Sequence, residues 1–196
     1  ASEAGGFDRI VIAYGLCGGG NARLRARSLP LALPRVPDCI AMLLGSHDAY
    51  RRQLAACPGT YYVSAGWVES QVERLSEQPD ELIENPVVAV EYEHLRRRYG
   101  EQEAEAVRDL LNSFRRNYGR AAFIDTGAGE RPEYYESLAR AMADRYGWSY
   151  EKLAGTRDLF VELLTAERSS DQVLLVPPEH ETRYRATAQQ MVAVPE

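Results

Sequence analysis

Two cysteine segments are the places in this sequence where residue types and spacing could do chemistry. Cys17 ends an apolar run and is followed by three glycines, whereas Cys39 follows Asp38, a good helix N-cap residue. Cys39 therefore falls in the first turn of a predicted helix, where the helix dipole lowers the pKa of a thiol. Thiolates are nucleophiles and ligands for soft metals. An inert thiol beside a turn is the other interpretation of each cysteine.

The glycines after Cys17 predict a loop that binds an anion. Gly18, Gly19 and Gly20 let the backbone turn sharply and approach a ligand closely. We predict a short helix over residues 21–27 behind them. The loop amides and the helix N-terminus would then favour negative charge, as in a phosphate-binding loop.

The elements that must position these residues alternate between strands and helices. Short apolar runs predict five strands, over residues 10–13, 28–33, 60–64, 121–125 and 173–176. Helical patterns lie between them, over residues 38–54 with a bend near Gly45, 65–76, 86–118 with a stop at Gly100, 132–146, and short helices within 148–165. This order predicts one α/β domain over residues 1–196, with a three-layer Rossmann-like fold and a mostly parallel sheet of about five strands.

In an open parallel sheet, the loops at the carboxyl ends of the strands meet at one edge, where ligands bind. We therefore expect one site at that edge. The candidate metal ligands are Cys17, Cys39 and, after the fifth strand, His180. Cys57 comes before a strand, so we expect it at the opposite edge. The candidate cofactor-binding residues are Gly18, Gly19, Gly20, Trp67, Asp125 and Gly127. For Asp125, a turn cap is the other interpretation, and for His180 it is a mobile tail.

Composition limits the function classes. With 45% hydrophobic and 27% charged residues, the 196-residue chain has an ordinary globular composition, and its net charge of -6 argues against a general nucleic-acid or anionic-membrane binder. No apolar run reaches the roughly 18 residues that a membrane span needs. Three cysteines at irregular spacing fit reduced thiols or metal ligands in the cytoplasm better than a disulfide framework. The first residues have neither an initiator Met nor a signal-peptide pattern, so we expect an N-terminal segment beyond this chain.

A series of motifs covers nearly the whole chain: Tyr14-Gly-Leu-Cys-Gly18, Pro34-Arg-Val-Pro-Asp-Cys39, Leu43-Leu-Gly-Ser46, Pro58-Gly-Thr-Tyr-Tyr62 with Gly66-Trp67, and Phe123-Ile-Asp-Thr-Gly127. The series resembles an uncharacterised domain-of-unknown-function family of anaerobe and methanogen proteins, often encoded near corrinoid-dependent methyltransferases. The resemblance implies a link to one-carbon and methyl metabolism, and a corrinoid protein or methyltransferase as partner. It also implies a further N-terminal strand, often with another cysteine. Many members carry histidine where this chain has Pro37.

Three functions follow from these residues. The first is a metal- or metallocofactor-binding protein in which Cys17 and Cys39 hold a thiophilic centre, either an iron–sulfur cluster or zinc. The expected N-terminal segment or a homodimer would complete the ligand set. The second is a thiol-dependent enzyme with Cys17 as nucleophile and the glycine amides as an oxyanion or phosphate loop. The third is a nucleotide-binding module, although the glycines lack both the P-loop and the dinucleotide pattern.

Overall fold

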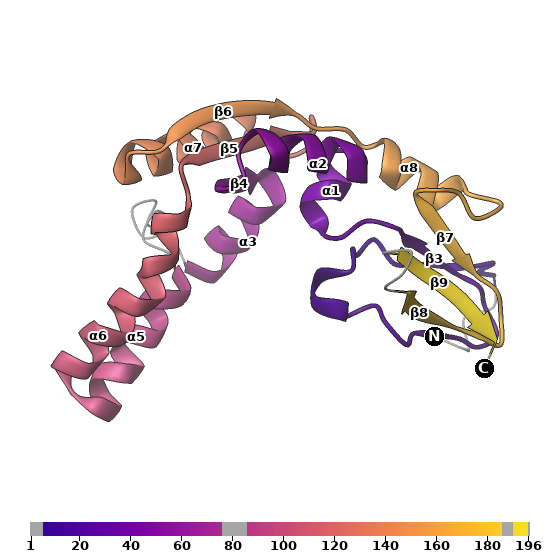
Figure 1. Cartoon of the computed structure of the whole chain (residues 1–196), viewed down its shortest axis with the longest axis horizontal. Coiled ribbons are helices and arrows are strands. Elements are labelled where there is room, and N and C mark those ends of the chain that lie inside the picture. The colour runs from indigo at the N-terminus through magenta and orange to yellow at the C-terminus, as the bar shows by residue number, and fades with distance from the viewer. Residues whose placement is uncertain (1–5, 76–85, 186–189, 196) are drawn as a thin grey trace. The chain divides into compact units, whose positions relative to one another are not determined.

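The computed structural model describes residues 6–75, 86–185 and 190–195, and its chain divides into two compact units (Figure 1). The terminal unit comprises residues 1–52 and 155–196, and the central unit comprises residues 53–154. The terminal unit contains two sheets and the central unit one, and each unit has its own apolar core over the described residues. Among the described residues, no helix combines the length and apolar character that crossing a membrane requires.

Two three-stranded sheets form much of the terminal unit. In one, β3 (Leu31–Pro34) lies between β1 (Ile10–Val11), which is parallel to it, and β7 (Val173–Val176), which is antiparallel. The other sheet is antiparallel throughout, with β8 (His180–Arg185) between β2 (Arg25–Ala26) and β9 (Gln190–Pro195). Leu33, Val176 and Met191 belong to one buried cluster, so the two sheets share a core.

Helices cover the other face of the β1–β3–β7 sheet. Leu159 and Leu163 of α8 (Asp158–Thr165) and Met42 of α1 (Cys39–Leu43) pack against Val173 of β7. Successive residues of β7 thus alternate between two cores, as the pleat of a strand requires. After α1 the chain turns at Gly45, which has φ +87°, and α2 (His47–Ala56) follows. The predicted bend near Gly45 is confirmed.

The central unit contains an all-parallel sheet in which β5 (Arg120–Asp125) lies between β4 (Thr60–Ser64) and β6 (Ser149–Ala154). Side chains from α3 (Ala65–Leu75) and α7 (Pro132–Tyr146) pack on one face of it, where Tyr135 is 1% exposed. The helices α5 (Pro86–Tyr99) and α6 (Glu101–Asn112) lie side by side and turn at Gly100, as predicted. A short 3-10 turn, η2 (Ser113–Asn117), then leads to β5.

A buried guanidinium joins the three strands of the central sheet. Arg120, at the start of β5, donates from Nε to Thr60 Oγ1 and from Nη2 to Gln53 Oε1, both at 2.9 Å. It also pairs with Glu151 of β6. The residue is 7% exposed, and a charge so deeply placed is stable only when partners replace its water.

The predicted five-stranded sheet is wrong, because over the described residues the strands belong to three small sheets, of which one is entirely parallel. The predicted helix over residues 21–27 is also wrong, since Arg25 and Ala26 form β2. The segment predicted as short helices begins instead with β6. The predicted first strand is shorter than expected, and Ile10 is 36% exposed instead of buried.

Candidate functional site

The backbone around Cys17 runs directly against the segment that leads to Cys39. The amide of Leu16 donates to the carbonyl of Val36 at 3.0 Å, and the amide of Cys17 donates to the carbonyl of Pro37 at 2.8 Å. Gly15 allows this approach, because a Cβ there would lie 2.8 Å from the Cα of Asp38. Parallel pairing of β1 with β3 sends both segments away from the same sheet edge. The two cysteine segments are therefore neighbours in the terminal unit.

Cys17 begins a 3-10 turn, η1 (Cys17–Gly19), in an uncommon backbone conformation. Its φ is +26°, a value that side chains with a Cβ rarely adopt, and the residue is half-buried. Residues in such conformations persist only where the surrounding structure holds them, at a cost of about 1–3 kcal/mol. Here the hydrogen bond to Pro37 is one of the contacts that holds Cys17.

The glycines after Cys17 serve the backbone conformation of the turn. Gly18 and Gly19 have φ +71° and +87°, and a Cβ on either would meet no atom within 4 Å. Gly20 is right-handed, and a Cβ there would lie 3.3 Å from Tyr14 Cε1. Because no helix follows, the expected combination of loop amides with a helix N-terminus is not formed. The phosphate-loop interpretation of these glycines is therefore no longer supported by a helix N-terminus.

Cys39 is the first residue of α1, and Asp38 is its cap. The Asp38 carboxylate accepts the amide of Ala41 at 3.0 Å, so the predicted cap is confirmed. The expected lowering of the Cys39 pKa is wrong: partial loss of hydration raises that pKa, followed by the negative charges of Cys17 and Asp38. Backbone hydrogen bonds at the helix start act in the lowering direction and are outweighed. The two thiols are thus close enough to interact electrostatically.

A cavity of about 200 Å³ adjoins both segments in the terminal unit. Its lining comprises Leu16, Arg35, Val36, Pro37, His47, Tyr184 and Met191. Leu16 and Pro37 immediately precede Cys17 and Asp38. Neither Arg35 nor His47 was among the residues that the sequence motifs predicted for this site. The predicted bend near Gly45 could have pointed to His47, because the bend makes this histidine the first residue of α2.

His180, the third candidate metal ligand, begins β8 and pairs with Ala26 of β2. Its Nδ1 lies 2.9 Å from the carbonyl oxygen of Pro178, so the ring is used in a local turn. Across residues 6–75, 86–185 and 190–195, no group of three His, Cys, Asp or Glu side chains is arranged to hold a metal ion. The described part of one chain therefore offers two thiols at this place and no third ligand.

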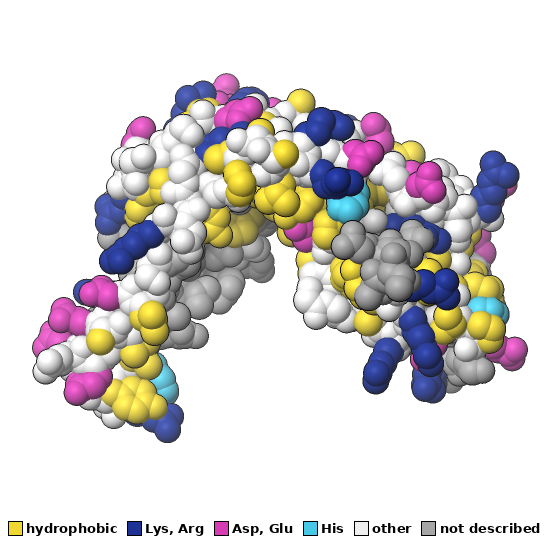
Figure 2. All heavy atoms as spheres, in the orientation of Figure 1, with side chains coloured by type: hydrophobic (Ala, Val, Ile, Leu, Met, Phe, Trp, Pro, Cys, Tyr) yellow, Lys and Arg dark blue, Asp and Glu magenta, His cyan; other side chains and the backbone are white. Residues whose placement is uncertain are grey.

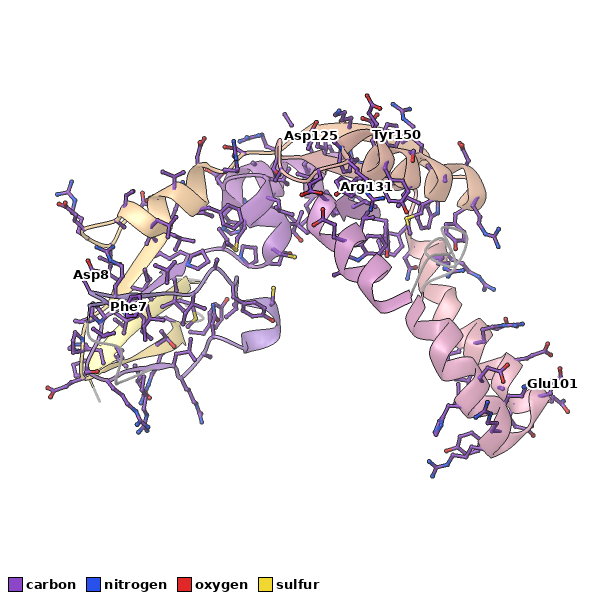
Figure 3. The ribbon with its side chains drawn as sticks, turned by 180° about the vertical axis from the view of Figure 1, so that it is seen from behind. Phe7, Asp8, Glu101, Asp125, Arg131 and Tyr150 are labelled. Atoms are coloured by element: carbon purple, nitrogen blue, oxygen red, sulfur yellow. The ribbon has the colours of Figure 1, made fainter. Side chains whose placement is uncertain are left out.

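The remaining candidates lie in the central unit. Asp125, labelled in Figure 3, ends β5, accepts the Gly127 amide at 2.9 Å and pairs with Lys152 at 3.0 Å. The hydrogen bond from the Gly127 amide lowers the pKa of Asp125 most, and the hydrogen bond from Lys152 lowers it further. Trp67 packs edge-to-face on Tyr61, with ring centroids 5.9 Å apart. These contacts support the turn-cap interpretation of Asp125 and a packing role for Trp67.

The predicted gathering of all candidates at one sheet edge is wrong, since the residues belong to different sheets. Cys17 and Cys39 follow β1 and β3, Asp125 ends β5, and His180 begins β8. Cys57 comes before β4 in the central unit, so its expected place at the far edge of a common sheet does not exist. Within the terminal unit, the Cys17 and Cys39 segments keep the expected neighbourhood.

A family model described as "Protein of unknown function (DUF1638)" matches residues 2–164, which is more than half of the chain. The chain therefore belongs to the DUF1638 family. No curated protein and no solved structure matches it.

Proposed function

We propose that this member of the DUF1638 family binds a thiophilic metal or metallocofactor through Cys17 and Cys39. The observation that carries the proposal is the backbone pairing of the two segments. In this pairing the amide of Cys17 donates a hydrogen bond to the carbonyl of Pro37, two residues before Cys39. Soft thiolate ligands select zinc, iron–sulfur centres and other thiophilic ions. Burial first, and then the negative charge of Cys17, raises the pKa of Cys39, and a cation held by both sulfurs would offset both effects.

Two thiols are fewer protein ligands than most zinc or iron–sulfur centres use. A structural zinc ion or an iron–sulfur cluster takes roughly four protein ligands per site, and the described residues of one chain supply two. We propose that the remaining ligands come from a second copy of this chain or from a cofactor that carries its own. On the ground of the motif resemblance, we also propose a link to methyl metabolism and a corrinoid protein or methyltransferase as partner. A reducing compartment such as the cytoplasm would keep the thiols available.

The test is metal analysis of protein purified without oxygen, together with its absorption spectrum. We expect iron or zinc in the wild-type protein, and its loss in both Cys17→Ser and Cys39→Ser. Cys57→Ser is the matched control, because that cysteine lies in the central unit. Equal metal content in all three variants would overturn the proposal. So would a wild-type protein that takes up neither metal when it is supplied.

The cavity beside the thiols favours a second candidate function, in which Cys17 is a nucleophile. His47 and Arg35 line that cavity, so they supply a base and an anion-binding group near the Cys17 segment. The raised pKa of Cys39 makes its own thiol a poor nucleophile at neutral pH. Alkylation with iodoacetamide, followed by mass spectrometry, separates the two functions. Fast labelling of Cys17 that slows in His47→Gln would favour the nucleophile over the metal ligand.

A further inference from the structure

A second and larger cavity lies on the β2–β8 side of the terminal unit, and neither thiol lines it. Its volume is about 670 Å³, and its lining comprises Ala22, Arg23, Arg25, Glu181, Arg183 and Tyr184. That volume lies within the usual range of small-molecule sites. The cavity thus combines three arginines and one glutamate with a tyrosine ring.

The chain before β2 is held in a fixed, strained conformation at this cavity. Thr182, which is fully buried, accepts the Arg23 amide at 2.8 Å, and its own amide donates to the carbonyl of Leu24 at 2.9 Å. Two residues of one segment thereby oppose one residue of β8, which is the arrangement of a β-bulge. Arg23 has φ +62°, an uncommon value for a residue with a Cβ. Bulges of this kind re-aim a side chain, and here the side chain lines the cavity.

Charge in the cavity is arranged around Glu181. Its carboxylate accepts a hydrogen bond from Arg183 Nε at 2.6 Å, lies 2.6 Å from Arg183 Nη2, and lies 3.9 Å from Arg25 Nε. It therefore orients Arg183 directly and lies within ion-pair distance of Arg25. Arg23 completes a positive lining in a chain whose net charge is -6. Figure 2 shows Lys and Arg side chains gathered on the terminal unit near β8 and β9. A local concentration of arginine against the overall charge favours an anionic ligand.

We propose that this cavity binds a small phosphate-bearing molecule with a planar ring, of the nucleoside phosphate class. Guanidinium groups bind phosphate oxygens through charge-assisted hydrogen bonds, and Arg23 and Arg183 present such groups from two different segments. Glu181 occupies the Nε and Nη2 side of Arg183, so Nη1 of Arg183 is the nitrogen left for a phosphate. Tyr184 is 45% exposed at the same cavity and offers a flat ring for stacking. Glu181 orients Arg183 in this arrangement.

The test is isothermal titration calorimetry with ADP and with inorganic pyrophosphate, which carries the phosphates without the ring. We expect ADP to bind the wild-type protein, and Arg23→Asn and Arg183→Gln each to weaken binding by about tenfold or more. Asn tolerates the positive φ of position 23, so that variant keeps the bulge. Arg27→Gln is the charge-matched control, because Arg27 is exposed and does not line the cavity.

The ring is tested by Tyr184→Ala. We expect this substitution to weaken ADP and to leave pyrophosphate unchanged. Absence of ADP binding, or equal weakening by Arg27→Gln, would overturn the proposed site. A Tyr184→Ala variant that binds ADP as the wild type does would overturn the stacking role. Binding of a single-stranded RNA in the absence of ADP binding would assign the arginines to a different partner and overturn the proposal.

Discussion

Gly129 lies in the loop between β5 and α7, and an alanine there should destabilise the central unit strongly. A Cβ at this position would lie 2.6 Å from Tyr135 Cε2 and 2.9 Å from the Cβ of Ala65. Tyr135 is 1% exposed, and its hydroxyl is hydrogen-bonded to Glu69, so the ring is buried in the core and held at its far end. The glycine also has φ +96°, which a residue with a Cβ rarely adopts.

The magnitude follows from two independent terms. The backbone term for a side chain at positive φ is about 1–2 kcal/mol. Overpacking a filled core adds about 1–3 kcal/mol. We therefore expect Gly129→Ala to lower the free energy of unfolding by about 2–5 kcal/mol. Gly127→Ala isolates the first term, because Gly127 has φ +67° and a Cβ there would meet no atom within 4 Å.

Urea unfolding followed by tryptophan fluorescence measures this difference. The chain has two tryptophans, Trp67 and Trp148, and both lie in the central unit, so the signal reports on that unit. We expect a lower midpoint with an unchanged slope for both glycine variants, and the larger shift for Gly129→Ala. Equal shifts would show that Tyr135 and Ala65 yield to the new methyl group, which would refute the packing argument.

Three further outcomes are expected. Asp38→Asn keeps the helix cap but removes a charge that raises the pKa of Cys39, so iodoacetamide should label Cys39 faster at neutral pH; an unchanged rate would contradict this. Gly19→Ala should lower the stability of the terminal unit by about 1 kcal/mol in urea unfolding followed by circular dichroism, because its φ is +87°. Hydrogen bonds from Lys152 first, and then from Arg140, lower the pKa of Glu136 from 4.5 to about 2. This ionised carboxylate stabilises the fold above pH 4.5, and the stabilisation is lost as the pH falls through about 2. Glu136→Gln should therefore flatten the acid limb of the pH–stability curve, whereas the exposed control Glu130→Gln should not.

Elements with clear local boundaries could be predicted from the sequence. The helix α7 begins at Pro132, a residue favoured in the first helical turn, and ends before Gly147, which adopts the left-handed C-cap conformation. Asp38 marks the start of α1 through its side-chain oxygen. In β5, residues 121–124 are all buried and apolar, so this strand appears in the sequence as a continuous apolar run. Each of these signals is contained in a few adjacent residues.

Strands that depend on distant partners could not be predicted in this way. In β6 only Leu153 is buried, and the strand exists because it pairs in parallel with β5 along the sheet edge. The residues around Arg25 have good helix propensity, yet they pair with Glu181 and His180 from the far end of the chain. Local composition carries no information on such pairing. For the same reason, the assignment of strands to three sheets could not be derived from their order.

Gly15 tests whether the two cysteine segments must touch for the proposed metal site to form. A Cβ at this position would lie 2.8 Å from the Cα and the carbonyl carbon of Asp38, and backbone atoms cannot turn aside as a flexible side chain can. We expect Gly15→Ala to push the segments apart and to weaken the hydrogen bonds from Leu16 and Cys17 to Val36 and Pro37.

The expected result for Gly15→Ala is a large loss of bound metal from a protein that still contains both cysteines. Gly19→Ala is the matched control, since it adds the same methyl group four residues along the chain, where a Cβ meets no atom within 4 Å. Circular dichroism establishes that each variant is folded before its metal content is measured. A metal site requires its ligands within a few tenths of an ångström of the preferred distances, so separating the two segments should empty it. Full metal occupancy in folded Gly15→Ala would therefore mean that the close approach of the two backbones is not needed for binding.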